Sequence, residues 1–297
     1  MMSEEPTVAL IGPGAIGTTI AAALHEVGRT PVVCGRTSHA QLLLRFDGGE
    51  ITLPGPVLTD PAAIVRPFSL VFVAVKATQN PTISAWLSAL CDEKTVVCVL
   101  QNGVEQQAQF ADRVAGATVL PAVVWFPAQR EPDASVWLRA TPRLTLPDLP
   151  QARLVQQTLQ GTRCAVDLAD DFTTVAWRKL LQNAVAGLMV LTGRRAGMFS
   201  RGDINDIALA YLRECLLVAR AEGARLSDSV PQEIIDGFHR APPDLSTSIQ
   251  IDRESGRPLE WEIRNGVVQR RGRRHGIPTP LSDLIVPLLA AASDGPG

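Results

Sequence analysis

The sequence contains few cysteines, no long apolar run and no strong excess of either charge. Its cysteines are scattered and odd in number, which is the pattern of neither a disulfide framework nor a metal site. No apolar stretch approaches the ~20 residues of a membrane span. The net charge of −2 gives no reason to expect nucleic acid or an anionic membrane as a partner. We therefore predict no metal, no nucleic acid and no membrane among its ligands and partners.

The first six residues, MMSEEP, are acidic and lack the basic start and apolar core of a signal peptide. Together with the scarcity of cysteine, this predicts a cytoplasmic protein. The chain has 297 residues, of which 46% are apolar and 20% charged. That composition suffices for full cores, and the length allows one large domain or two ordinary ones.

A glycine-rich turn stands between a predicted strand and a predicted helix near the start of the chain. The apolar run Val8–Ile11 leads directly into the turn GPGAIG, and small residues at helical spacing follow over Thr18–Leu24. This order is typical of a dinucleotide-binding βαβ unit, in which free N–H groups of the first helical turn face the pyrophosphate. A chance glycine turn is the alternative, and no Gly-Lys-Ser/Thr follows, which excludes a P-loop. The predicted cofactor-binding residues here are Gly12, Gly14, Ala15, Ile16 and Gly17.

The second predicted strand ends without the acidic residue that would bind the ribose of NAD. Arg36 follows the run Pro31–Cys34, and no carboxylate occurs between Glu26 and Asp47. An arginine fork pairs well with a 2′-phosphate, so we predict NADPH rather than NADH. A solvated surface arginine would leave the choice of cofactor open.

Two further apolar runs predict buried parallel strands, and each ends at a polar residue. Ser69–Val75 is followed by Lys76, and Thr95–Leu100 by Asn102. Ligands bind at the carboxyl ends of such strands, although Lys76 could simply open a loop and Asn-Gly is a turn signal by itself. With the additional candidate strands, this alternation predicts an α/β fold with a doubly wound parallel sheet. The additional strands are Thr118–Val124, Arg143–Leu146 and Cys164–Leu168.

The second part of the chain is predicted to be helical. We place the domain boundary near residue 170, which gives a dinucleotide-binding domain over 1–170 and a helical domain over 171–297. In the predicted helix Thr174–Leu191, the residues Lys179, Asn183 and Gly187 share one stripe. This stripe either forms a site or faces solvent. The final helices could form the contact of a homodimer, but they show no distinct apolar stripe that requires one.

These pieces together resemble the ketopantoate reductase family, over nearly the whole chain. The glycine turn alone would not indicate this, but four further motifs match in order and spacing. They are Lys76, Asn102-Gly103, Trp177-Arg178-Lys179-Leu180 with Asn183, and Ser248, Asp252, Gly256-Arg257, Glu260 and Asn265-Gly266. The resemblance implies a Rossmann-type domain, a second all-helical domain and NADPH-dependent reduction of a 2-oxo acid, with the site in the cleft between the domains.

The resemblance also implies a role for each matching residue. Lys179 is expected to be the general acid, and Glu260 to bind the substrate or its new hydroxyl and to influence Lys179. Asn183 and Ser248 are expected to bind the substrate, including its carboxylate. Arg36 is expected to hold the 2′-phosphate, and Asn102 and Lys76 are expected to lie near the nicotinamide and Lys179.

Two departures from the family pattern put the substrate in doubt. Gly187 and Leu245 stand where asparagines are often found, so we expect a roomier and more apolar substrate pocket. Ketopantoate is the leading candidate, and a less polar 2-oxo acid is the alternative. A β-hydroxyacid-type dehydrogenase and a non-catalytic NADPH-binding sensor remain as further hypotheses.

Overall fold

The computed structural model describes residues 6–295, and residues 1–5, where we expect no signal peptide, lie outside this range. The described chain forms two compact units. The first contains the residues up to Gln101 and Glu105–Phe172, and the second contains Asn102–Val104 and the residues from Thr173 onward. The predicted domain ranges 1–170 and 171–297 stay a prediction. Among residues 6–295, no helix combines the length and apolar character needed to cross a membrane.

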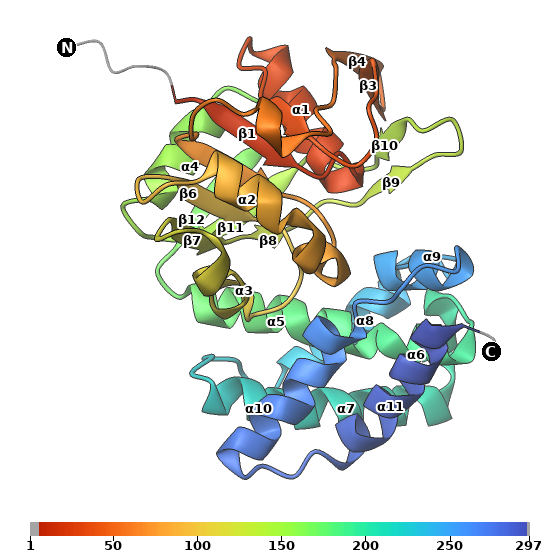
Figure 1. Ribbon diagram of the computed structural model, residues 1–297. Helices are drawn as coiled ribbons and strands as arrows, with labels where there is room; N and C mark the ends of the chain where they lie inside the picture. Colours follow the sequence, from red (N-terminus) through yellow and green to blue (C-terminus); the bar gives the residue numbers. More distant parts are fainter. Residues whose placement is uncertain (1–5, 296–297) are drawn as a thin grey trace. The chain divides into compact units, whose positions relative to one another are not determined.

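A parallel sheet with helices on both faces forms the centre of the first unit (Figure 1). Its order is β2-β1-β5-β6-β7, and all four neighbouring pairs are parallel. The fold prediction of a doubly wound sheet is therefore confirmed. The strands are β1 Val8–Ile11, β2 Val32–Cys34, β5 Leu70–Val73, β6 Val96–Val99 and β7 Thr118–Pro121, and the helices of this unit are α1 Ala15–Glu26, α2 Ser84–Leu90, α3 Gln106–Phe110 and α4 Ala152–Leu159.

Alternation along the buried strands divides the apolar residues between two cores. Leu10 of β1 and Phe72 of β5 pack with α1, whereas Ile11 and Val73 pack with α2. Because successive strand residues point to opposite faces, a run that is apolar at every position needs a covering helix layer on each side. The continuous apolar runs in the sequence have this structural cause.

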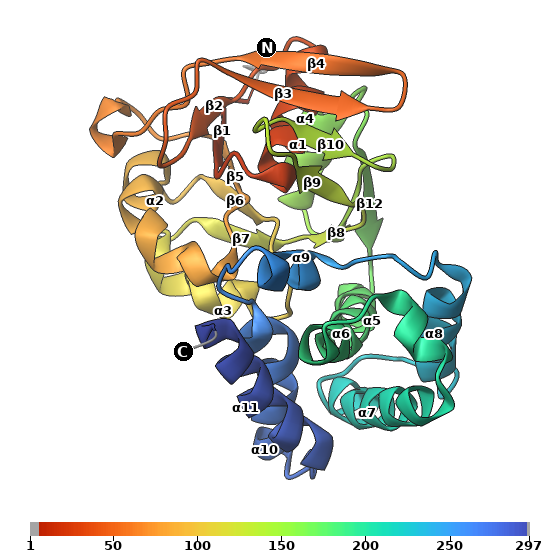
Figure 2. The same cartoon turned by 90° about the vertical axis from the view of Figure 1, so that its right-hand side faces the viewer.

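Two smaller sheets accompany the central one (Figure 2). The run Thr118–Val124, predicted as one strand, divides at Ala122 between β7 of the central sheet and β8 of a smaller sheet. Pro121 has no N–H to continue a strand ladder, which favours the break. The predicted strands near 143 and 165 are present, but outside the central sheet. The two smaller sheets have the orders β4-β3-β10-β9 and β12-β11-β8, with β3 Gln41–Phe46, β4 Gly49–Pro54, β8 Val123–Val124, β9 Ala128–Arg130, β10 Val136–Leu138, β11 Arg143–Pro147 and β12 Ala165–Ala169.

The described residues of the second unit are helical, as predicted. Its core includes Trp177, Leu180, Tyr211 and Leu289, all at most 2% exposed. Helical spacing of such residues along each element predicts this arrangement. The elements are α5 Phe172–Val185, α6 Gly187–Thr192, α7 Gly202–Ala221, α8 Val230–Arg240, α9 Ser248–Glu254, a π-helix Glu262–Gly266, α10 Val267–His275 and α11 Pro280–Asp294.

Asn265 fixes the π-helix at the point where α5 gives way to α6. The predicted helix Thr174–Leu191 is interrupted at Ala186, and the fully buried Asn265 amide donates to the Ala184 carbonyl (2.9 Å) and to the Tyr211 hydroxyl (3.0 Å). A β-carbon on Gly187 would lie 2.9 Å from the Asn265 side-chain nitrogen. Glycine at 187 therefore leaves the space that Asn265 needs.

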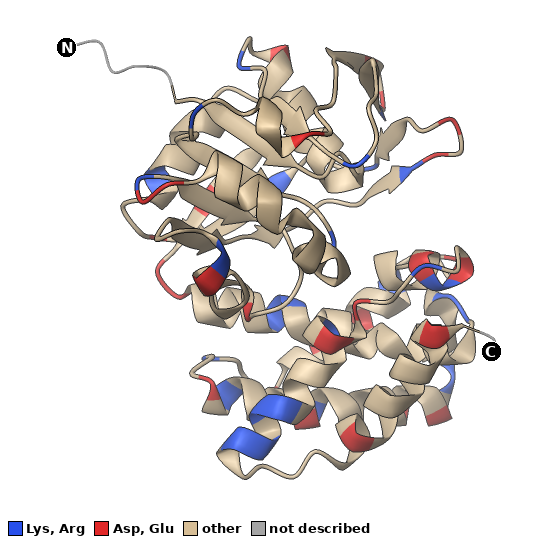
Figure 3. Cartoon of the chain, in the orientation of Figure 1, with Lys and Arg blue, Asp and Glu red and all other residues tan. Residues whose placement is uncertain are grey.

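Basic residues are frequent on α10 (Figure 3). Arg273 pairs with Asp283 of α11 (3.3 Å), and Arg271 lies 3.5 Å from Glu222 at the end of α7. Neighbouring acids thus compensate part of this charge. Such partly exposed pairs contribute little to stability, on the order of 0–1 kcal/mol each.

The glycine turn provides a prediction about stability. A β-carbon on Gly17 would lie 2.1 Å from the Gly12 carbonyl oxygen, whereas one on Gly14 has no neighbour within 4 Å. We expect Gly17→Ala to lower the free energy of unfolding by roughly 1–3 kcal/mol through overpacking. The matched control is Gly14→Ser, which places a favoured residue at the N-cap of α1 and should fold normally. Urea denaturation measures both, and equal stability of the two variants would contradict the steric argument.

Candidate functional site

The predicted cofactor residues of the first unit gather at the point where the strand order reverses. β1 pairs with β2 on one side and with β5 on the other, and the glycine turn follows β1 directly. Ligands bind at such a switch point, outside the carboxyl ends of the strands. The first turn of α1, which includes Ala15 and Ile16, begins there, and the space beside Gly14 is open. The turn therefore fits a pyrophosphate that approaches the backbone at a helix N-terminus.

Arg36 and Lys76 follow the two strands that flank β1. Arg36 is exposed two residues after β2, and Lys76 is partly buried three residues after β5. A buried pair of side-chain amides, which we did not predict, holds the loop after β5. The Gln101 side-chain nitrogen donates to the Val75 carbonyl (2.9 Å) and to the Asn80 side-chain oxygen (2.6 Å). The position of Gln101, next after a buried strand, was the available signal.

A chain of polar contacts joins the predicted residues of the second unit. The Asn183 amide donates to the Asn102 side-chain oxygen (3.1 Å), and the Asn102 amide donates to Glu260 (3.4 Å). Arg264 donates from one nitrogen, Nη2, to Glu260 (3.3 Å) and to the Ser248 hydroxyl (2.9 Å). Asn102, which we expected near the nicotinamide, thus lies among the predicted substrate residues.

Lys179 lies one helical turn before Asn183 on α5. The helix forms because Trp177, Leu180 and further apolar residues supply its buried face, while Lys179 stays partly buried at the edge of that face. Burial, and then repulsion by the Arg264 guanidinium, lowers the pKa of the Lys179 ammonium from 10.5 to about 8. At pH 7 the ammonium is mostly charged, yet it releases its proton far more readily than an ordinary lysine.

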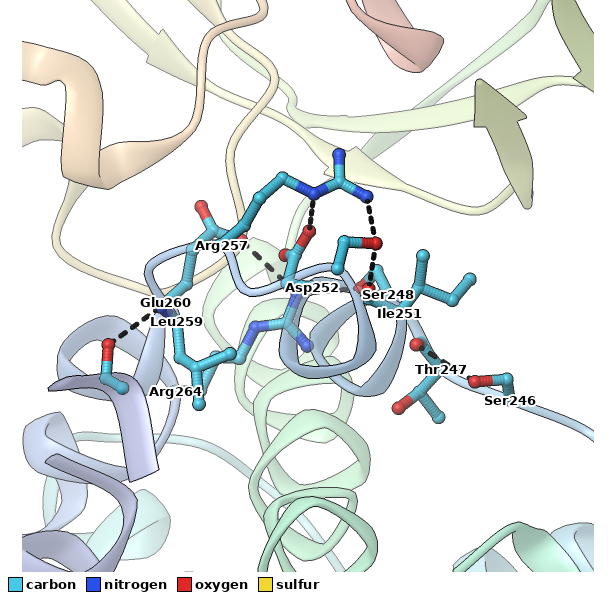
Figure 4. A network of polar contacts seen from close by, with 11 residues as sticks. Ser246, Thr247, Ser248, Ile251, Asp252, Arg257, Leu259, Glu260 and Arg264 are labelled. Atoms are coloured by element: carbon cyan, nitrogen blue, oxygen red, sulfur yellow. Dashed lines mark hydrogen bonds and ion pairs between the residues drawn. The ribbon is translucent and has the colours of Figure 1, made fainter. Parts of the chain in front are cut away.

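The segment that carries Ser248 and Glu260 is held in place by its own polar contacts (Figure 4). Arg257 lies 3.5 Å from the buried carboxylate of Asp252, and its N–H donates to the Asp252 carbonyl. The Leu259 N–H donates to Ser293 of α11 (2.9 Å). Glu260, which follows, is only 6% exposed, whereas Ser248 at the start of α9 is exposed.

Arg264 is the residue of this site that the sequence analysis missed. It is 1% exposed, and it is the largest of the fully buried side chains among the described residues. The available signal was its position four residues after Glu260, one helical turn on, in a stretch with apolar residues at helical spacing. Arginine is rarely fully buried unless it is paired, so a surface position was the natural expectation.

The expectation that Gly187 enlarges a substrate pocket is wrong. A β-carbon there would meet the Asn265 side-chain nitrogen at 2.9 Å and Leu289 at 3.0 Å, so the space is filled. Leu245 lies in a loop and is 41% exposed. Residues 6–295 contain no group of three or more His, Cys, Asp or Glu side chains placed to hold a metal ion. The cysteines are all free and buried, as small apolar residues would be.

Comparison with known proteins agrees with this arrangement. The model of the family "Ketopantoate reductase PanE/ApbA" matches residues 8–151, and the model of its C-terminal part matches residues 171–293. A 2-dehydropantoate 2-reductase of Mycobacterium tuberculosis is 52% identical, over 98% of this chain and 99% of that protein. One from Caulobacter vibrioides is 35% identical, over 97% and 99%.

A solved structure is similar over the same range. The dimeric ketopantoate reductase from Staphylococcus aureus is 26% identical and covers 98% of this chain and 100% of its own, with a TM-score of 0.89. The predicted resemblance is therefore confirmed, and the chain belongs to the ketopantoate reductase family.

Proposed function

We propose that this protein is a cytoplasmic NADPH-dependent reductase that converts a 2-oxo acid to a 2-hydroxy acid. The ketopantoate reductase family uses NADPH, and the relatives carry the name 2-dehydropantoate 2-reductase, which makes 2-dehydropantoate (ketopantoate) the leading substrate. The observation that carries the proposal is the contact chain of the second unit, which unites Asn183, Asn102, Glu260 and Ser248. The cofactor residues lie in the predicted domain 1–170 and Lys179 in the predicted domain 171–297.

Lys179 supplies the proton for the reaction. NADPH supplies the hydride that reduces the keto carbon. Negative charge develops on the former carbonyl oxygen, and an ammonium placed beside that oxygen stabilises the charge and then delivers a proton. The pKa of about 8 suits this role, because Lys179 is charged at neutral pH and still a competent acid. Glu260 accepts a hydrogen bond from the new hydroxyl.

Asn183 and Ser248 bind the substrate. An amide and a hydroxyl can both donate hydrogen bonds to the carboxylate and the polar side chain of a 2-oxo acid. A site that contains paired polar groups discriminates strongly against substrates that cannot satisfy them. The filled space beside Gly187 removes one reason to expect a bulkier substrate.

Turnover of defined substrates tests the proposal. Purified protein is mixed with NADPH and ketopantoate, and in parallel with bulkier 2-oxo acids, while NADPH oxidation is followed. We expect ketopantoate to react fastest, and Lys179→Ala to lose about 10²–10⁴-fold in kcat. The matched control is Arg178→Ala, which removes the neighbouring exposed arginine that pairs with Glu233. Faster turnover of another 2-oxo acid would change the assigned substrate from ketopantoate to that acid. Cofactor binding without any turnover would favour the sensor hypothesis.

The pKa of Lys179 predicts a pH dependence. Above pH 8 the ammonium loses its proton, so kcat/KM for reduction should fall about tenfold per pH unit, with an apparent pKa of about 8. The reverse reaction needs the neutral amine and should instead gain over the same range. Initial rates between pH 6 and 10 measure both directions. A constant kcat/KM up to pH 10 would contradict the assignment of Lys179 as the acid.

Arg36 predicts the choice of cofactor. Arg36→Ala removes charge-assisted hydrogen bonds to a 2′-phosphate, which should raise the KM for NADPH by roughly 10–100-fold and leave the KM for NADH nearly unchanged. Arg66→Ala is the control, since it removes an exposed arginine elsewhere in the first unit. If both cofactors weaken equally, Arg36 does not contact the 2′-phosphate.

We also infer that the protein is a homodimer. The relative from Staphylococcus aureus is dimeric, and α11 exposes Leu284 (60%) and Leu288 (49%) one turn apart. Adjacent exposed leucines suit an interface between copies. Sedimentation equilibrium gives the mass in solution, and a monomer at micromolar concentration would exclude the dimer.

A further inference from the structure

The burial of Arg264 has no evident benefit for stability. Its side chain is 1% exposed, and its Nε atom is buried without a hydrogen-bond partner among the described residues. Removing a guanidinium from water costs several kcal/mol, and an apolar residue of similar volume often serves stability equally well. A buried, incompletely satisfied cation therefore calls for another explanation.

We propose that Arg264 is a positioning residue of the reductase, which orients Ser248 and Glu260 toward the 2-oxo acid and acts through its charge on Lys179. This inference rests on the proposed function. Figure 4 shows Arg264, Ser248 and Glu260 in one network. Because the guanidinium is almost wholly buried, we assign it no direct contact with substrate.

The contact with Ser248 determines which way the hydroxyl proton points. A serine hydroxyl has one proton to donate and two lone pairs that accept. Arg264 Nη2 donates to this oxygen at 2.9 Å, and a guanidinium cannot accept a hydrogen bond. The hydroxyl proton must therefore point away from Arg264. Ser248 is exposed at the start of α9, so it presents a donor to an acceptor outside the network, such as a carboxylate.

The contact with Glu260 fixes a carboxylate in one orientation. The same Nη2 atom lies 3.3 Å from Glu260 Oε2, which also accepts from the Asn102 amide at 3.4 Å. Two donors from different segments restrict rotation of the carboxylate, and this leaves it ready to accept from a substrate hydroxyl. Glu260 lies four residues before Arg264, just ahead of the π-helix that carries Arg264.

The charge of Arg264 acts on Lys179 and on the net charge of the site. After burial, repulsion by the guanidinium is the second cause that lowers the pKa of Lys179. Of the other nearby charges, Arg178 on α5 pairs with Glu233, whereas Glu260 contacts Arg264 itself. Arg264 and Lys179 are both cations, and their positive charge attracts an anionic substrate.

Two substitutions separate the charge of Arg264 from its hydrogen-bond geometry. Arg264→Met removes both, whereas Arg264→Lys keeps the charge and loses the Nη2 group that donates to both acceptors. Arg273→Met is the control, because it removes a mostly exposed arginine of α10. The first readout needs no activity: the pH dependence of Lys179 acylation, measured by mass spectrometry, gives its midpoint of deprotonation. The second readout is the split between KM and kcat for the reduced 2-oxo acid.

We expect the midpoint for Lys179 to be about 8 in the unaltered protein and to move toward 10.5 in Arg264→Met. In Arg264→Lys it should stay near 8, while the KM for the 2-oxo acid rises roughly 10–100-fold in both variants. If the role of Arg264 were purely structural, the midpoint of Lys179 deprotonation would change in neither variant. If Arg264→Met fails to fold, Arg264→Met with Glu260→Gln removes the unpaired carboxylate, and Glu260→Gln alone is then the reference for the acylation midpoint.

An unchanged Lys179 midpoint in a folded Arg264→Met protein, or an unchanged KM in both variants, would overturn the inference. Failure of the proposed function looks different: the unaltered protein would then reduce no 2-oxo acid, while the acylation midpoint would still report whether Arg264 acts on Lys179.

Discussion

The contact between Glu260 and Arg264 is the interaction on which the candidate site of the second unit depends. It links a chain of donors and acceptors that starts at Asn183 and ends at Ser248. Both charges are buried, and a buried ion pair with one partner removed is far more costly than the intact pair. The pair therefore constrains the sequence around it, and Asn265 next to Arg264 anchors the same π-helix to the Ala184 carbonyl.

The glycine turn of the first unit depends on sterics rather than on charge. The turn after β1 brings the Gly12 carbonyl so close to Gly17 that a β-carbon has no room, while the space beside Gly14 stays open. Dense packing behind the turn and open space in front of it place the N–H groups of α1 where a phosphate can reach them. The two candidate sites thus rely on different interactions: the shape of the backbone in the first unit, and paired side-chain charges in the second.

Much of the fold could be predicted from the sequence, because periodicity and glycine placement are local signals. The runs at Val8–Ile11 and Leu70–Val73 read as buried strands, and the face of α5 placed Lys179 and Asn183 together. The break at Ala186, the division of 118–124 between two sheets and the burial of Arg264 were not predictable in this way. The break at Ala186 depends on Asn265 beside Gly187, which is distant in sequence. Pro121 is a local signal for the division of 118–124, but the pairing of β7 with β6 and of β8 with β11 is not local. For Arg264, the contact with Ser248 is also non-local.

Arg264 illustrates how a site can be costly for stability and useful for chemistry. In the proposed mechanism Lys179 donates a proton near neutral pH, which needs a pKa well below 10.5, and burial is the larger cause that lowers this pKa to about 8. The neighbouring Arg264 guanidinium lowers the pKa further by repulsion and adds positive charge of its own. The ammonium becomes a better acid while the site as a whole still attracts an anion. The proposed reduction of a charged 2-oxo acid needs both properties together, and we infer that the buried Arg264 contributes to each.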